Sequence, residues 1–154
     1  LHTVKGDNSG HEPLEAPMSN NMPIVLAPQQ ARQLAQGLAG LRGLIGAVAL
    51  VAPARALKPW AGAEVAGLPG GRLVGRALGG RDLALAAGAF LAMRNDGPVR
   101  GWIEAGGLAD TGDVVATLVA FRQLPRVTRW GVLALTLGAV GAAYVIAPSV
   151  DQKD

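Results

Sequence analysis

The chain has 154 residues, of which half are hydrophobic, 16% are charged and 4% are aromatic. This length suits one domain, but an ordinary soluble domain carries about 25% charged residues, so the composition favours a protein with lipid as part of its solvent. The absence of cysteine excludes disulfides, thiolate metal sites and cysteine nucleophiles, and the only histidines, His2 and His11, make a zinc site unexpected. The net charge of +3 comes without a basic run or stacking aromatics, which favours membrane-flanking arginines over a nucleic-acid partner.

The N-terminal residues 1–28 are polar, rich in Pro, Asn, Gly and Ser, and without a hydrophobic period, so we expect a disordered tail. Because the first residue is not methionine, we expect a processed chain, a fragment, a translated non-AUG start, or a true start at Met18 or Met22. Residues 29–148 are predicted to form one all-α domain, a four-helix transmembrane bundle, and 149–154 a polar C-terminal tail.

The first predicted span covers about 38–52, within a helix that starts near Gln29 and stops at Pro53. Small residues recur along it and would let a second backbone approach closely; they are Gly37, Gly40, Gly43, Gly46, Ala49 and Ala52. Arg42 interrupts this apolar run, and two interpretations remain open for it. Its side chain extends to the membrane interface, or it pairs with a buried carboxylate from another helix.

Residues 53–71 contain three prolines and several glycines and are expected to form a loop. The second span follows over 73–93. Small residues at four-residue spacing predict close helix crossing in two series, Gly80, Ala84, Gly88 and Ala92, and Gly75 and Gly79. The same span holds the adjacent charged residues Arg81 and Asp82, with Arg76 before them. A charge inside an apolar segment points to a specific role.

The third span, 99–122, follows a short Asn-Asp-Gly turn and is the least hydrophobic of the four. Asp110 and Asp113 are three positions apart, so they share one face of the helix, and Thr117 continues that face. Glu104 lies on a different face near the outer end of the helix, so we expect it to be hydrated.

The fourth span, 130–147, includes seventeen uncharged residues, and Pro148 ends it. A packing ridge is predicted along it at Ala134, Gly138 and Ala142.

Tryptophans lie in or beside the connections, as in an interfacial belt: Trp60, Trp102 and Trp130. Four spans put both termini on one side of the membrane. The first and third connections carry more Lys and Arg than the opposite side, which predicts that the termini are outside.

The charged residues of the spans are expected to gather at the centre of the bundle; they are Arg42, Arg76, Arg81, Asp82, Asp110 and Asp113. An unpaired charge in a dry interior is costly, so Arg81 is predicted to pair with the third-span aspartates, and Asp82 with Arg42 or Arg76. Adjacent helical residues point about 100° apart, which argues against Arg81 and Asp82 as a catalytic dyad. Three roles remain open: pairing that fixes helix register, handling of a ligand or proton, and hydrated charges at the interface. Two carboxylates without further ligands make a metal site unexpected.

Two stretches carry a resemblance, GLPGGRLVGRALGGRDLALAAGAFLAM and GWIEAGGLADTGDVVATLVAF. They resemble an uncharacterised family of small four-helix bacterial membrane proteins of actinobacterial type, similar in layout to DoxX-like proteins. The shared marks are Gly-Arg-Asp-Leu at 80–83 and the aspartates Asp110 and Asp113. The resemblance covers about 32–148 and implies four transmembrane helices, a multi-pass position in the bacterial inner membrane and no established activity. DoxX-like proteins are linked with quinone or redox partners, but a chain without cysteine gives no residues to which that role transfers.

The leading functional expectation is non-enzymatic. It is a small integral membrane protein acting as an accessory or scaffold component, packed through its Gly/Ala ridges against a second copy or a larger membrane complex. The alternative is a binding protein for a small amphiphile, a quinone or a lipid, at the Arg/Asp cluster. Two further hypotheses are a membrane redox or proton-transfer enzyme and a soluble helical bundle with a hydrophobic oligomer interface. No P-loop, dinucleotide fingerprint or Ser/His/Asp set occurs, so no catalytic residue, metal or cofactor is predicted.

Overall fold

The computed structural model describes residues 26–152, and within this range the protein is all-α. Six helices follow one another along it: α1 (Pro28–Val51), α2 (Pro53–Ala61), α3 (Ala63–Gly67), α4 (Pro69–Arg94), α5 (Arg100–Val119) and α6 (Arg126–Ile146). The four long helices coincide with the four predicted hydrophobic segments. The predicted disordered tail at 1–28 lies almost entirely outside the described residues.

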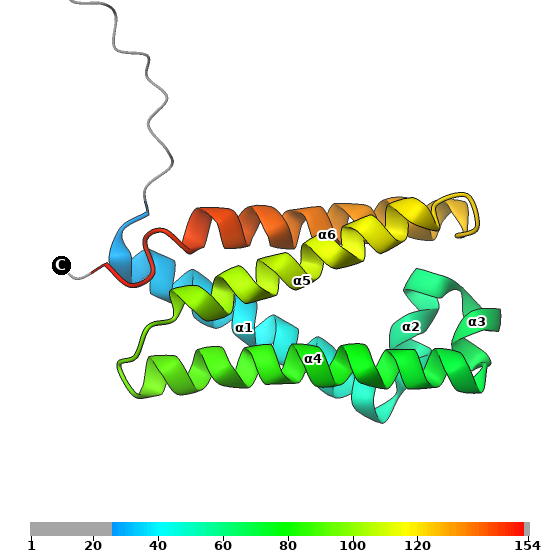
Figure 1. Cartoon of the computed structure of the whole chain (residues 1–154), viewed down its shortest axis with the longest axis horizontal. Coiled ribbons are helices and arrows are strands. Elements are labelled where there is room, and N and C mark those ends of the chain that lie inside the picture. The colour runs from blue at the N-terminus through cyan, green and yellow to red at the C-terminus, as the bar shows by residue number, and fades with distance from the viewer. Residues whose placement is uncertain (1–25, 153–154) are drawn as a thin grey trace, which may run out of the picture.

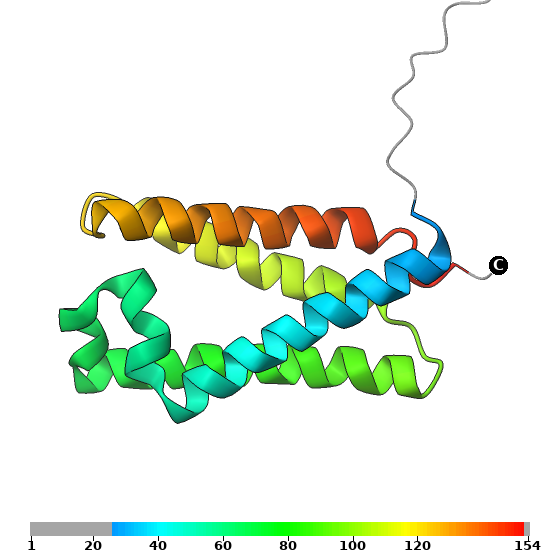
Figure 2. The ribbon, with the colours of Figure 1, turned by 180° about the vertical axis from the view of Figure 1, so that it is seen from behind.

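The long helices pack as two pairs, α1 on α4 and α5 on α6. Figures 1 and 2 show α1 crossing α4 obliquely, while the short helices α2 and α3 sit at one end of the bundle. Proline begins three of the helices, since Pro28, Pro53 and Pro69 each occupy an early helical position, where the missing N–H is not needed.

The predicted loop over 53–71 is wrong, because this stretch forms α2, α3 and the start of α4. Pro53 and Pro69 lie at helix starts, and Pro59 lies inside α2. Gly62 separates the two short helices with a backbone φ of 87°, a conformation that glycine adopts without strain. In α2, Leu57 is buried whereas Arg55 and Lys58 are exposed, so the helix is amphipathic.

α1 and α4 approach so closely that glycine is required at their crossing. A Cβ atom added to Gly79 would lie 2.7 Å from the carbonyl oxygen of Gly46, and one added to Gly46 would lie 2.8 Å from that of Gly79. Farther along, a Cβ at Gly43 would lie 3.3 Å from the Cβ of Ala86. The small residues predicted along the first span therefore let the two backbones touch.

Helix packing was predicted at Gly80, Ala84, Gly88 and Gly138, and the structure places these four residues differently. Gly88 contacts another helix, because the ring of Trp102 lies directly against it. The other three have open space beside them or are exposed within the described chain: Gly80, Ala84 and Gly138. Instead, Gly79 faces α1, and Gly75 faces Pro53 at the start of α2. Adjacent helical positions differ by about 100°, so a ridge beginning at the next residue faces another way.

One end of the bundle has a dry core of small and medium side chains. The first turns of α1 and α5 meet the last turn of α6 there, together with the segment that follows it. The buried members of this core are Ala31, Ala35, Val99, Ile103, Ala143, Ile146, Ala147 and Val150. We call this region the closed end.

The expectation of a polar C-terminal tail after Pro148 is wrong for the described residues 149–152. Ser149 and Val150 are each 1% exposed and belong to the interior of the closed end. Asp151 caps α5: its Oδ1 accepts a hydrogen bond from the backbone N–H of Val99 (2.8 Å), and its Oδ2 accepts one from that of Arg100 (2.9 Å). The first amides of a helix have no partner within it, so this carboxylate ties the segment after α6 to the start of α5.

Two helices are long and apolar enough to cross a membrane: α1, and α6 over Thr128–Ile146. α4 and α5 do not meet the same criteria, since each carries charged residues in mid-helix, Arg81 and Asp82 in α4 and two aspartates in α5. Length and composition therefore support two of the four predicted spans.

Candidate functional site: an ion-pair cluster beside an apolar cavity

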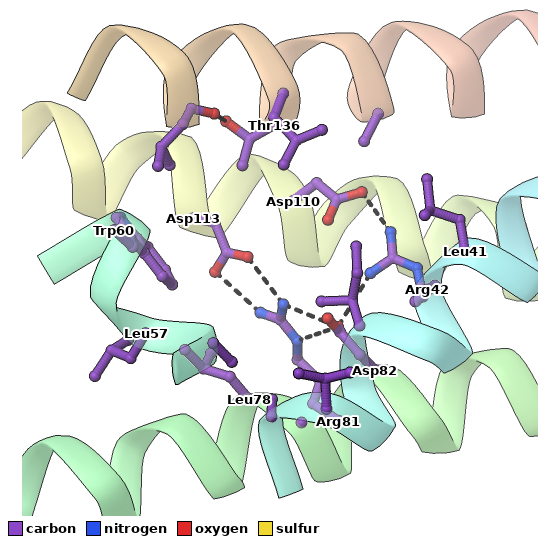
Figure 3. Close-up of a pocket in the computed structure, with 18 of the residues that line it drawn as sticks. Leu41, Arg42, Leu57, Trp60, Leu78, Arg81, Asp82, Asp110, Asp113 and Thr136 are labelled. Carbon is purple, nitrogen blue, oxygen red and sulfur yellow. Dashed lines mark hydrogen bonds and ion pairs between the residues drawn. The ribbon is translucent and has the colours of Figure 1, made fainter. Parts of the chain in front are cut away.

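The ion pair between Arg81 and Asp113 joins α4 to α5. Nη1 of Arg81 donates to Oδ1 of Asp113 (3.0 Å), and Nη2 donates to Oδ2 (2.9 Å), as Figure 3 shows. Two parallel bonds from a planar guanidinium to one carboxylate fix its orientation as well as its distance, which lysine cannot do. The two side chains are 31% and 16% exposed, so the pair lies in the interior rather than on the surface.

Asp82 connects the two arginines of the site. Its Oδ1 accepts hydrogen bonds from Nη1 of Arg42 (3.1 Å) and from Nε and Nη2 of Arg81 (3.1 and 3.0 Å). Nη2 of Arg42 donates in turn to Oδ2 of Asp110. The side chains of Arg42 and Asp110 are each only 10% exposed. One network thus ties α1, α4 and α5 together, and we call it the ion-pair cluster: Arg42, Arg81, Asp82, Asp110 and Asp113.

Gly106 is a part of the site that sequence reasoning missed. Nη2 of Arg42 also donates to its carbonyl oxygen (3.4 Å), and a Cβ atom at this position would lie 3.2 Å from the same nitrogen. Glycine therefore lets the guanidinium lie flat against the backbone of α5. The sequence feature that could have revealed this residue is the glycine pair at 106 and 107, one turn before Asp110.

Arg76 is the predicted cluster member that the structure leaves out. It is exposed and forms no ion pair with any residue of the described chain. Arg76 precedes Arg81 by five positions, which is about 140° around the helix, so both cannot face α5. Glu104 is also exposed, and its Oε1 lies 2.6 Å from Nε of Arg100 one turn earlier.

A cavity of about 500 Å³ adjoins the ion-pair cluster. Apolar side chains from α1, α2 and α6 make up most of its wall, among them Leu41, Leu44, Ile45, Val48, Leu57 and Leu135. All five cluster residues also line it, as Figure 3 shows. The size lies within the range of about 300–1,000 Å³ that is typical of ligand sites.

α2 supplies one wall of this cavity and is held in place by Trp60. Its Nε1 donates to Oγ1 of Thr117 (3.1 Å), whose hydroxyl donates to the carbonyl oxygen of Asp113 (2.7 Å). Trp60 was expected in a loop at a membrane interface, yet it is half-buried and lines the cavity. The apolar spacing of Pro53, Leu57 and Trp60, at i, i+4 and i+7, is the helical signal that could have revealed this wall.

The cluster contains two guanidinium groups and three carboxylates, which four ion pairs join into one network. Within residues 26–152, no group of three or more His, Cys, Asp or Glu is arranged to hold a metal ion. The geometry is suited to binding and orienting a molecule against a largely apolar wall.

No family model, no curated protein and no solved structure matches this chain. The resemblance to the small four-helix membrane proteins therefore stays a prediction, and the function has to be inferred from the site.

Proposed function

We propose that this protein is a multi-pass membrane protein that binds a small amphiphile in the cavity beside its ion-pair cluster. The observation that carries the proposal is an apolar space of about 500 Å³ with five charged, largely buried side chains in its wall. Ligand sites of this kind combine a mostly apolar wall with a few polar groups that fix orientation. In this arrangement the apolar body of the ligand lies between α1 and α6, and its head group meets the cluster.

The outer surface supports the membrane part of the proposal. The most apolar windows of α1 and α6 are 22% and 17% buried inside the chain, so most of their side chains face outward. α4 and α5 also expose large apolar side chains, for example Leu73, Leu91, Leu108 and Val119. Water solvates such a surface poorly, whereas lipid solvates it well. The cluster residues of α4 and α5 face the interior, as charged residues in membrane bundles do.

We infer from this surface that all four long helices span the bilayer, with both termini on one side and the bacterial inner membrane as the location. The full chain is then expected in the membrane fraction, and its extraction is expected to require detergent. Recovery from the aqueous fraction without detergent would favour a soluble bundle with an apolar oligomer interface.

Blocking the cavity tests the binding function. Ala139 of α6 lines the cavity, so Ala139→Phe places a ring inside it, whereas Ala84→Phe places the same ring on an exposed face of α4. Native mass spectrometry of the detergent-purified chain is expected to detect a bound small amphiphile on the wild type and on Ala84→Phe, but not on Ala139→Phe. Equal retention by all three would show that the amphiphile binds elsewhere, and the cavity would lose its assigned role.

A second candidate function is that of an accessory or scaffold subunit, and the exposed face of α6 favours it. Gly131, Gly138 and Gly141 have nothing within 4 Å of the position of an added Cβ, so another helix could approach this backbone closely. The same native spectra distinguish the two functions. A stoichiometric protein partner that is lost in Gly138→Leu would support the accessory function.

A further inference from the structure

We propose that the head group of the ligand is a protonated amine, so that the cavity takes a lipophilic cation. This inference rests on the proposed function and specifies the chemistry of its site. It follows from the balance of charge in the cavity wall, from two carboxylate oxygens left without donors, and from the apolar character of the remaining wall.

The charge balance of the cavity wall is negative. The charged residues that line the cavity are the five of the ion-pair cluster, two arginines and three aspartates. Arg55 and Lys58 of the neighbouring α2 are exposed and do not line it. One carboxylate charge is therefore uncompensated by any side chain of the wall. A low-dielectric space strengthens the attraction of that charge for a cation and its repulsion of an anion.

Two carboxylate oxygens in the cluster have unused capacity to accept hydrogen bonds. Asp82 and Asp110 are bonded through Oδ1 and Oδ2, respectively, and no donor among the described residues reaches the other oxygen of either. The side chain of Asp110 is nine-tenths buried, yet its free oxygen keeps some accessible surface, since Nε of Arg129 is the one fully buried side-chain atom without a partner among the described residues. Because Asp82 and Asp110 both line the cavity, these two oxygens can be reached from it. An ammonium group carries donors and the missing positive charge, so it satisfies both requirements at once.

The donors that a neutral or anionic head group would need are largely engaged. Nε, Nη1 and Nη2 of Arg81 each donate to a carboxylate, and Nη1 and Nη2 of Arg42 do the same. A quinone or a fatty acid presents acceptors only, so it would compete with the aspartates for these groups. The site therefore discriminates by head group, while its leucines and isoleucine accept any apolar body of suitable size.

Three probes with the same alkyl chain test this inference: a primary n-alkylamine, the n-alcohol and the fatty acid. Their binding to the full chain in a non-ionic detergent is followed by Trp60 fluorescence, since Trp60 lines the cavity, and by native mass spectrometry. Ala139→Phe in the same micelles corrects for partition into detergent. We expect the amine to bind about tenfold more tightly than the alcohol, because of its charge-assisted bonds to the aspartates, and the acid to bind most weakly.

Asp110→Asn should lower the affinity for the amine to that for the alcohol and leave the alcohol unchanged, with Glu104→Gln as the surface control. Equal or tighter binding of the alcohol or the acid to the wild type would overturn the amine assignment while leaving the proposed function intact. If no probe binds more to the wild type than to Ala139→Phe, both the assignment and the proposed function fail. The wild-type series decides between these outcomes even if the Asp110 variant does not fold.

Discussion

The two ends of the bundle differ in the size of the side chains that face the interior. At the closed end, Ala31, Ala35, Ala143 and Ala147 are 0–4% exposed, so the helices meet with little space between them. The other end, which we call the open end, is the region lined by α2, the second half of α1 and the first half of α6. Leucines, an isoleucine and a tryptophan surround about 500 Å³ there without filling it.

This difference shows how a small bundle can combine a stable core with an unfilled space. The closed end supplies tight packing, in which van der Waals contacts are complete. The ion-pair cluster lies between the two ends and joins α1, α4 and α5 at the depth where close packing stops. These ion pairs therefore fix how α1, α4 and α5 approach one another beside the open end.

Removing Arg42, the more buried of the two cations of the cluster, should have the largest effect on stability. Arg42→Ala leaves Asp110, whose side chain is 10% exposed, without its guanidinium partner. We expect the free energy of unfolding in detergent to fall by about 3–5 kcal/mol, the range found when one partner of a buried ion pair is removed. The control is Arg76→Ala on the exposed face of α4, with a change of about 0.5 kcal/mol or less. Similar losses in both variants would mean that the ion-pair cluster does not stabilise the bundle.

Truncation of one buried aliphatic side chain at each end tests the packing difference directly. Ile103 of the closed end is 4% exposed, and Ile103→Ala is expected to cost about 2–5 kcal/mol through lost contacts and a new cavity. Leu57 is 6% exposed but lines an existing cavity, so Leu57→Ala removes fewer contacts and should cost less. Equilibrium unfolding of both variants gives the comparison, and a greater loss for Leu57→Ala would contradict it.

The crossing of α1 and α4 allows a test with neighbouring glycines. Gly79→Ala would place a Cβ atom 2.7 Å from the carbonyl oxygen of Gly46, whereas Gly80→Ala would meet nothing within 4 Å. Overpacking of this kind costs about 1–3 kcal/mol. Thermal unfolding should therefore show a lower midpoint for Gly79→Ala and an unchanged or higher one for Gly80→Ala. A lower midpoint for Gly80→Ala than for Gly79→Ala would place the helix crossing on the ridge that was predicted from Gly80 and Ala84.

The smallest effect is expected at the Asp151 cap of the closed end. Asp151→Ala leaves the backbone N–H groups of Val99 and Arg100 without their acceptors. Loss of such a cap costs about 1 kcal/mol. Hydrogen exchange at these two amides should accelerate, while exchange at the Gly46–Gly79 crossing stays unchanged. Unaltered protection of both amides would show that the segment after α6 does not hold the start of α5.

The sequence allowed the long helices and several ion pairs to be predicted, because both follow from local patterns. Long apolar runs with few charges indicated the four segments, and the cost of a lone buried charge led from Arg81 to the aspartates of α5. Arg76 was wrongly included because the presence of a charge in a segment does not show which face of the helix carries it. The interval of five residues from Arg81 already contained that information.

α2 and the cavity were not predicted, for two different physical reasons. Proline at 53 and 69 is equally compatible with a loop and with a helix start, and in the sequence only the apolar spacing of Pro53, Leu57 and Trp60 favours a helix. The cavity depends on the separation of α1 and α6, which the side chains of three other elements determine. Whether Leu135 and Val48 meet or leave a space between them is therefore a property of the whole fold and not of either segment.

The Asp151 cap also makes the order of synthesis relevant to folding. Val99 is translated 52 residues before the carboxylate that accepts its amide hydrogen bond. At about 5–20 residues per second, the ribosome needs roughly 3–10 s to produce that residue. During this interval the backbone N–H groups of Val99 and Arg100 lack the carboxylate that accepts their hydrogen bonds in the folded protein. The closed end can therefore assemble completely only after α6 has been made, and until then the emerging α4–α5 segment depends on its environment for these bonds.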